Sequence, residues 1–218
     1  MSAKHAFGNR SANFHALQVS GVPLRDRRVL EIGCGNGYLS EYVRSLGATV
    51  VGCDITPPAV LPDVQFVQAD GAALPFGQHF DVVMSFDVLE HIPDTDQHLR
   101  EVRRVLRPGG YYVLQTPNKM TNVVFETIRW RSFTAWKSDH CSLHTFGQLQ
   151  RRFRAAGFSL QFLDVPVVNR YFVDKVRSQL GQLGVLAVAL FNPDRFPLRF
   201  RTNFYAVARL RSADAADR

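Results

Sequence analysis

Short apolar runs alternate with amphipathic stretches along most of the chain. The apolar runs predict strands, at residues 28–32, 49–53, 64–69, 80–86, 111–116, 158–165 and 200–210. Apolar positions at helical spacing predict helices at residues 38–46, from Asp94 to the stop at Pro108, and at 146–156. Strands that alternate with helices in this way are typical of a largely parallel sheet with helices on its faces.

Polar residues at two helix starts support these boundaries. Asp94 and Thr145 are good N-caps, and each is followed three residues later by a glutamine, Gln97 or Gln148, which predicts a capping box. The link from 54 to 64 departs from the alternation, because it is short and contains three prolines. Proline breaks helices, so we expect a loop or a single turn there.

The turn after the first predicted strand, in the segment LEIGCGNGYLS, has glycine at alternate positions, Gly33, Gly35 and Gly37. Glycine lets a backbone take positive φ and approach a ligand closely. In open parallel sheets, ligands bind beyond the carboxyl ends of the strands, where the strand order reverses. The turn therefore suits a nucleotide-like ligand. Its G-x-G-x-G spacing is one residue tighter than the G-x-G-x-x-G of dinucleotide-binding folds. Alone, this difference does not decide between a dinucleotide and another nucleoside cofactor.

Three acidic residues lie at or beside strand ends next to this turn. Asp54 ends the second strand, where it could accept from both hydroxyls of a ribose. Asp70 ends the third, where it could accept from an adenine amino group. Glu31 lies in the buried first strand, where a carboxylate needs a partner such as loop amides or a cationic ligand group. Each acid alone could be a turn or cap residue, but the three together favour a nucleoside ligand.

The segment 29–118 resembles a class I S-adenosylmethionine-dependent methyltransferase. VLEIGCGNGYLS is similar to the family's first motif, VVGCDIT to the second and LRPGGYYVLQTPN to the strand-five segment, and VQADGAALPFGQHFDVVMSFDVLEHIPD resembles the stretch between them. The resemblance implies a doubly wound, Rossmann-like α/β fold. Its seven-stranded, mostly parallel sheet has an antiparallel last strand, helices on both faces and a lid insertion after strand five, with substrate-side insertions at 118–144 and 166–198.

The cofactor that the resemblance implies is S-adenosyl-L-methionine. The glycine turn would pack against its methionine part, and Glu31 would steer its ammonium group. The other residues implied as cofactor-binding follow the strand ends: Asp54 for the ribose, Ile55, Asp70 and Gly71 for the adenine, and Ser85 and Phe86 near the sulfur.

Three histidines are candidates for catalysis, His91, His140 and His144. His91 follows strand four beside the expected methyl site, where it could act as a base or have a structural role. His140 and His144 could line the acceptor pocket, which we favour over a zinc site because no second ligand pair accompanies them. Asp87, Glu90 and His91 could meet at a divalent ion, as the family's quinone-precursor O-methyltransferases suggest, but we expect no metal.

The insertion after strand five mixes aromatic and basic residues: Phe125, Trp130, Phe133 and Trp136 among Arg129, Arg131 and Lys137. This mixture suits a flat or amphipathic acceptor with negative charge, or a small accessory core. Residues 174–191 predict a helix that is apolar on most sides from Leu183 onward. It could pack under the lid, pair with another subunit or touch a membrane surface.

Length and composition suit one domain, which we expect over residues 1–211 with a disordered tail at 212–218. No apolar run reaches the roughly 18 residues of a membrane-spanning helix, and the start lacks a signal-peptide pattern. Three cysteines do not make a disulfide framework. We therefore expect a cytoplasmic protein. The net charge of +7 favours an anionic partner or a solvated basic face, and does not by itself imply nucleic acid.

The function expected from these features is methyl transfer to oxygen or nitrogen of a small molecule, such as a lipid-linked, sugar or specialised metabolite. An RNA or protein methyltransferase is the alternative. The Asn/Asp-Pro-Pro-Tyr element of amino-directed nucleic-acid methyltransferases does not follow strand four, where Ser85-Phe86-Asp87 stands. A non-catalytic cofactor-binding partner subunit is a third hypothesis, and a nicotinamide oxidoreductase is the last.

Overall fold

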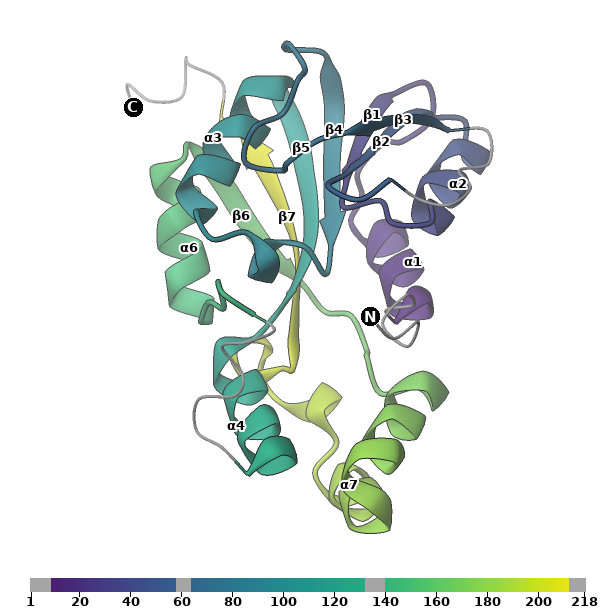
Figure 1. Ribbon diagram of the computed structural model, residues 1–218, viewed down its shortest axis with the longest axis vertical. Coiled ribbons are helices and arrows are strands. Elements are labelled where there is room, and N and C mark those ends of the chain that lie inside the picture. Colours follow the sequence, from purple (N-terminus) through teal and green to yellow (C-terminus); the bar gives the residue numbers. More distant parts are fainter. Residues whose placement is uncertain (1–8, 58–63, 132–139, 212–218) are drawn as a thin grey trace.

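The computed structural model describes residues 9–57, 64–131 and 140–211. One seven-stranded sheet organises them, in the order β3-β2-β1-β4-β5-β7-β6 (Figure 1). The strands are β1 Arg28–Ile32, β2 Thr49–Asp54, β3 Gln65–Gln68, β4 Phe80–Phe86, β5 Leu106–Pro117, β6 Phe158–Leu163 and β7 Asn203–Leu210. β7 pairs antiparallel with β5 and with β6, and the other pairs among these strands are parallel. The predicted fold class is confirmed, and the strand order reverses between β1 and β4.

Six α-helices accompany the sheet in the described residues: α1 Arg10–Val19, α2 Tyr38–Ser45, α3 Thr95–Val105, α4 Lys119–Trp130, α6 Phe146–Ala155 and α7 Arg170–Leu190. Three short 3₁₀ helices are η2 Leu89–His91, η3 Pro193–Arg195 and η4 Leu198–Phe200. The predicted last strand is therefore too long at its start, since Phe200 belongs to η4. β5 starts earlier than predicted, because Pro108 and the glycines after it continue as strand instead of turn.

One predicted capping box is confirmed and the other forms only in part. At α6 the Thr145 side chain accepts from the Gln148 amide N–H, and the Gln148 side chain accepts from the Thr145 amide N–H. At α3 the Asp94 side chain accepts from the Gln97 amide N–H. The Gln97 side chain does not return that bond, because its Oε1 accepts from Arg100 Nε at 2.9 Å while its amide nitrogen donates to the carbonyl of Ala72 at 3.3 Å.

Each face of the sheet has its own apolar core. The helices α3 and α6 cover one face with residues such as Leu99, Val102 and Phe153. The helices α1 and α2 cover the other with residues such as Leu17 and Leu39. Burial of both faces explains why β1 and β4 read as continuous apolar runs.

The helices α4 and α7 lie beyond the sheet, at its lower end in Figure 1. β5 leads directly into α4, so this is the end to which the parallel strands point their carboxyl termini. The start of α7 is tied to the start of α1, since the Asn169 amide donates to Asn9 Oδ1 at 2.6 Å and to Ser11 Oγ at 2.7 Å. Residues 58–63, Phe133, Trp136, Lys137 and the tail 212–218, on which predictions were made, lie outside the described residues.

Candidate active site

The turn between β1 and α2 has the open backbone that its glycines predict. Gly33, Gly35 and Gly37 all have positive φ, at 71°, 50° and 74°. A Cβ added at Gly33 would lie 2.2 Å from Val88 Cγ2, while a Cβ at Gly35 would meet nothing within 4 Å. Gly33 is therefore required for packing against the segment after β4. Gly35 instead leaves free space beside the backbone, where a ligand can approach.

Asp54 ties the end of β2 to this turn. Its Oδ2 accepts from the Gly35 amide at 3.0 Å, and its Oδ1 accepts from the Thr56 amide at 3.0 Å. The side chain is half-buried, and each carboxylate oxygen can accept more than one hydrogen bond. The carboxylate is thus held in place and keeps acceptor capacity toward a diol. The next residue, Ile55, is 67% exposed and offers an apolar surface beside it.

Glu31 is buried beneath the turn, with 3% of its surface exposed. The hydroxyl of Ser40, on α2, donates to its carboxylate. Burial raises the pKa of Glu31 to about 8, against the lowering effect of Ser40. The partner that the sequence required for Glu31 is therefore a neutral hydroxyl. A cationic group placed near the turn would favour the ionised carboxylate.

The third strand end is also organised by backbone contacts. Asp70 is exposed, and its Oδ1 accepts from the Ala72 amide at 2.8 Å. Gly71 is buried, and its carbonyl accepts from His98 Nδ1 at 2.8 Å. The structure thus joins Asp54 to the glycine turn through the Gly35 amide and holds Glu31 beneath the turn through Ser40 on α2. It places Asp70 and Gly71 after the neighbouring strand β3.

A chain of hydrogen bonds behind these groups was not predicted. His98 Nε2 lies 2.8 Å from the hydroxyl of Tyr112, which lies 2.6 Å from Ser85 Oγ. Burial lowers the pKa of His98 to about 4, so the ring is neutral. A carbonyl only accepts, so Nδ1 donates to Gly71, Tyr112 donates to Nε2 and Ser85 donates to Tyr112. The sequence offered one indication, since His98 shares the inward helical spacing of Val102 and Val105.

Ser85 and Phe86 end β4 and are both buried. The Ser85 hydroxyl is committed to Tyr112, and Phe86 packs on Tyr205 with ring centroids 6.5 Å apart. The next residue, Asp87, has φ of 56°, which is strained for a residue other than glycine. Its amide donates to Gln115 Oε1 at 2.7 Å, which holds the turn at the end of the strand.

Asp87 is solvent-exposed but densely surrounded, and this desolvation raises its pKa against the lowering effect of Lys175. Its charge also contributes to the raised pKa values of three tyrosines, Tyr38, Tyr171 and Tyr205. Lys175 and Tyr171 come from α7, so this helix brings polar groups to the end of β4.

Two of the three candidate histidines come together. The rings of His91 and His140 have centroids 5.2 Å apart, although they are distant in sequence. The segment that carries His140 is held by the Ser142 amide, which donates to the Glu90 carbonyl at 3.0 Å. Ligand atoms of Glu90, His91 and His140 all lie within 4.8 Å of one another. Glu90 is buried, and burial with the nearby Asp87 raises its pKa to about 8.

His144 lies apart from this pair. It is buried, with Nε2 3.4 Å from Thr95 Oγ1, and its carbonyl accepts from the Lys119 amide at 3.0 Å. Burial lowers its pKa to about 4, so it is neutral. These contacts join the start of α3 to the start of α4, and this placement favours a packing role.

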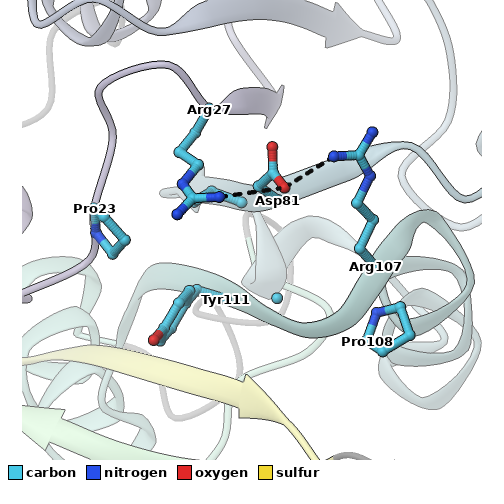
Figure 2. Close-up of a pocket in the computed structure, with 8 residues that line it drawn as sticks. Pro23, Arg27, Asp81, Arg107, Pro108 and Tyr111 are labelled. Carbon is cyan, nitrogen blue, oxygen red and sulfur yellow. Dashed lines mark hydrogen bonds and ion pairs between the residues drawn. The ribbon is translucent and has the colours of Figure 1, made fainter.

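A separate pocket of about 150 Å³ lies at the opposite end of the sheet, where β4 and β5 begin. Figure 2 shows Arg27 and Arg107 on two sides of Asp81, with nitrogen–oxygen distances of 4.0 and 3.1 Å. Asp81 also accepts from the Arg28 amide at 2.9 Å. Its carboxylate thus joins the starts of three segments, and the pocket is remote from the glycine turn.

The comparison with protein families identifies the family of the chain. The family described as a methyltransferase domain matches residues 8–161, which include the glycine turn and all three acids. The chain belongs to this methyltransferase family. The resemblance read from the motifs is therefore confirmed.

The relatives agree with this assignment. A ubiquinone biosynthesis O-methyltransferase of Rhizobium etli is 34% identical over 119 residues, covering 50% of this chain and 48% of that protein. A structure titled as an S-adenosylmethionine-dependent methyltransferase of Mesorhizobium loti has a TM-score of 0.64 at 18% identity, over 93% of this chain and 100% of that one. The [4+2]-cyclase SpnF has a TM-score of 0.65 at 22% identity, over 94% of this chain and 81% of that one.

The sequence relatives and the structural neighbours support different conclusions. The chain spans about half the length of the curated relatives it matches. The structural neighbours share the fold, and one of them is named for a cyclisation, so the fold alone does not fix the reaction. In the described part of the methyltransferase chain, no helix is both long and apolar enough to cross a membrane.

Proposed function

We propose that the protein binds S-adenosylmethionine across the ends of β1 and β2 and transfers its methyl group to a small-molecule acceptor. The observation that carries this is the Asp54 carboxylate, fixed by the Gly35 and Thr56 amides beside a turn with free space at Gly35. A carboxylate placed there suits a ribose diol. It would repel a pyrophosphate, the group that a dinucleotide cofactor would bring to the turn.

The other residues of the turn fit the rest of this cofactor. Glu31 would face its ammonium group. Burial keeps this carboxyl group mostly protonated, and a nearby cation would stabilise its ionised form. Ile55 would cover one face of the adenine, and Asp70 with Gly71 would receive its polar edge. The hydrogen-bond chain through His98 fixes the Gly71 carbonyl in position.

When bound, the cofactor supplies a methyl group on a sulfonium, whose leaving group is already good. The protein then has to hold the acceptor atom in line at near-attack distance. A hydroxyl acceptor must also lose a proton. We propose that His91 takes it, since His91 is exposed next to the end of β4 and histidine side chains can act as bases. His140 would orient the His91 ring from the side.

The acceptor class follows from chemistry and from the relatives. We propose a hydroxyl on a flat molecule with an apolar part, because the curated relatives are named as ubiquinone biosynthesis O-methyltransferases. Exposed apolar side chains on α4 and the tyrosines around Asp87 offer surfaces for such a molecule. Nitrogen acceptors remain the alternative, and they would need no base if unprotonated.

Calorimetry with S-adenosylhomocysteine and with NAD tests the cofactor assignment. We expect binding of S-adenosylhomocysteine alone. Asp54→Ala should weaken it at least about 100-fold, since two charge-assisted hydrogen bonds to the ribose are lost. Glu41→Ala is the matched control, because it removes an exposed carboxylate from the first turn of α2. Unchanged affinity in Asp54→Ala would mean that the ribose lies elsewhere, and heat with NAD would favour an oxidoreductase.

The role of His91 is tested by turnover. His91→Ala should lower methyl transfer to a phenolic acceptor about 100-fold or more without changing cofactor affinity. Glu90, His91 and His140 could instead hold a divalent cation. Under that alternative, a chelator would reproduce the loss in the unsubstituted enzyme and added Mg²⁺ or Zn²⁺ would restore it. Normal turnover in His91→Ala would exclude both roles for this residue.

A further inference from the structure

The end of the molecule formed by α4 and α7 exposes large apolar side chains. We call this surface the apolar lobe. Its members are Met120, Val124, Ile128, Trp130, Leu183, Leu186, Leu190, Phe191, Phe196 and Phe200. Leu183 is 81% exposed, Phe191 68% and Leu190 67%. Single exposed apolar residues are ordinary, but a group of this size on α4, α7 and the segment after α7, at one end of the molecule, is typical of an interaction surface (Figure 1).

The second half of α7 carries the most exposed members. The helix is interrupted at Gly181, whose φ is 65° and ψ −161°. From there to Asp194 the chain contains no charged residue. This stretch of helix is about 14 Å long, roughly half of the hydrocarbon thickness of a bilayer. It can therefore lie in the surface of a membrane, and it is too short to cross one.

Basic residues flank the apolar stretch on both sides. Arg170, Lys175 and Arg177 precede it, and Arg195 and Arg199 follow it. All five are exposed.

The nearby acids are already engaged. Asp174 pairs with Arg170 and Arg177 at 3.8 and 2.7 Å. Asp194 accepts from the Val167 amide at 2.9 Å and from the Val168 amide at 2.9 Å. The second half of α7 therefore presents an uncharged apolar stretch, flanked on both sides by more basic than acidic residues.

We propose that the apolar lobe docks on an anionic lipid bilayer. The leucines and phenylalanines would enter the interface, while the arginines would contact lipid phosphates. A second copy of this chain is a poorer occupant, because a symmetric contact would set the same basic edges against each other. The arginine edges and the uncharged helix are complementary to a negative surface that has an apolar interior.

The lobe shares the helix α7 with residues that interact with Asp87, at the end of β4. The first half of α7 carries Tyr171 and Lys175, whose electrostatic interactions are with Asp87. Docking through the second half of the same helix would place the site next to the bilayer. This last step rests on the proposed function, but binding to lipid does not, so each can fail without the other.

Flotation of the full chain with vesicles tests the proposal. We expect the protein to float with phosphatidylcholine vesicles that contain phosphatidylglycerol, and to float weakly with phosphatidylcholine alone. Leu183→Glu should reduce binding at least about tenfold, because it places a charge in the interface. Arg195→Gln with Arg199→Gln should reduce it roughly fivefold per residue, and only on anionic vesicles. Val19→Glu is the control, because it places the same charge at an exposed apolar position of α1, 43% exposed, outside the lobe.

Melting temperatures and calorimetry with S-adenosylhomocysteine show whether each variant is folded. The proposal is overturned if the unsubstituted protein stays with the unbound fraction on anionic vesicles at low salt, or if Leu183→Glu floats as well as Val19→Glu. A concentration-dependent dimer that Leu183→Glu dissociates, without flotation, would assign the lobe to a second copy instead. Flotation that is equal on neutral and anionic vesicles would remove the role of the arginines and overturn the anionic specificity.

Discussion

The glycine turn and the apolar lobe are built on opposite principles. Around the glycine turn, polar groups already have partners inside the protein: Asp54 holds two amides and Glu31 accepts from Ser40. Around α4 and α7, apolar side chains lie in solvent, with Leu183 81% exposed. The first region is organised before any ligand arrives. The second has large exposed area that only another surface can cover.

This difference separates two uses of binding energy. A preorganised polar site loses little entropy on binding and can discriminate one cofactor. An exposed apolar surface gains free energy from any apolar partner, so it suits a partner defined by its physical class. Substitutions should therefore have large, specific effects at the turn and small effects on folding in the lobe.

The largest loss of stability is expected from Gly33→Ala. Its Cβ would lie 2.2 Å from Val88 Cγ2, and φ is 71°, so steric overlap adds to backbone strain. We expect a loss of about 3–5 kcal/mol. Gly21→Ala is the control, since it has φ of 66° with nothing within 4 Å, and it should cost only about 1–2 kcal/mol. Equal losses in urea unfolding would show that Val88 moves aside.

Glu31 should make the stability of the ligand-free protein depend on pH. Its folded pKa, about 8, is above its ordinary value of 4.5, so folding favours the protonated form. The stabilisation is complete below 4.5 and is lost as the pH rises through about 8, by an amount on the order of 5 kcal/mol. Glu90 acts in the same direction. Glu31→Gln should flatten this fall and also weaken S-adenosylhomocysteine.

Urea unfolding across that pH window measures the effect. Saturating S-adenosylhomocysteine should reduce the fall in the unsubstituted protein, because its ammonium group stabilises the ionised carboxylate. An identical pH profile in Glu31→Gln would contradict the assignment of the slope to this residue.

Tyr112→Phe tests whether the buried hydrogen-bond chain matters to the cofactor side. The change leaves Ser85 Oγ and His98 Nε2 without their shared partner. Buried polar groups without partners cost about 1–3 kcal/mol in the free energy of unfolding. Tyr111→Phe is the control, since Tyr111 is half-buried and its ring contacts Arg209. If both variants unfold at the same urea concentration as the unsubstituted protein, the chain does not stabilise the fold.

The same contrast explains which parts of the fold could be predicted. The strands and the helices α2, α3 and α6 bury one clear face, so their apolar spacing is visible in the sequence. α1 was missed, because its buried residues include the small Ala12 and Ala16 and the polar Asn13. α4 and the second half of α7 expose apolar residues, so no inward stripe marks their orientation.

The candidate site divides in a similar way. Glu31, Asp54 and Asp70 could be found because each lies at a strand end or in the strand before the glycine turn. The proximity of His91 and His140 could not, because it depends on the segment of Ser142 folding back onto Glu90. The spacing of residues along the sequence does not indicate such a contact. The roles of the cofactor-binding residues and of the histidines stay predictions.

The smallest effect on folding is expected from Leu183→Ala, and this change tests most directly how the apolar lobe differs from the cofactor side. Leu183 is 81% exposed, so its removal should alter the free energy of unfolding by no more than about 0.5 kcal/mol. Leu39→Ala is the counterpart on the cofactor side, where a fully buried leucine on α2 should cost about 2–5 kcal/mol. Urea unfolding compares the two. If Leu183→Ala costs as much as Leu39→Ala, the apolar lobe is covered in solution by the protein itself. A difference of the expected size means that Leu183 contributes little to the folding of the chain alone, as its exposure requires.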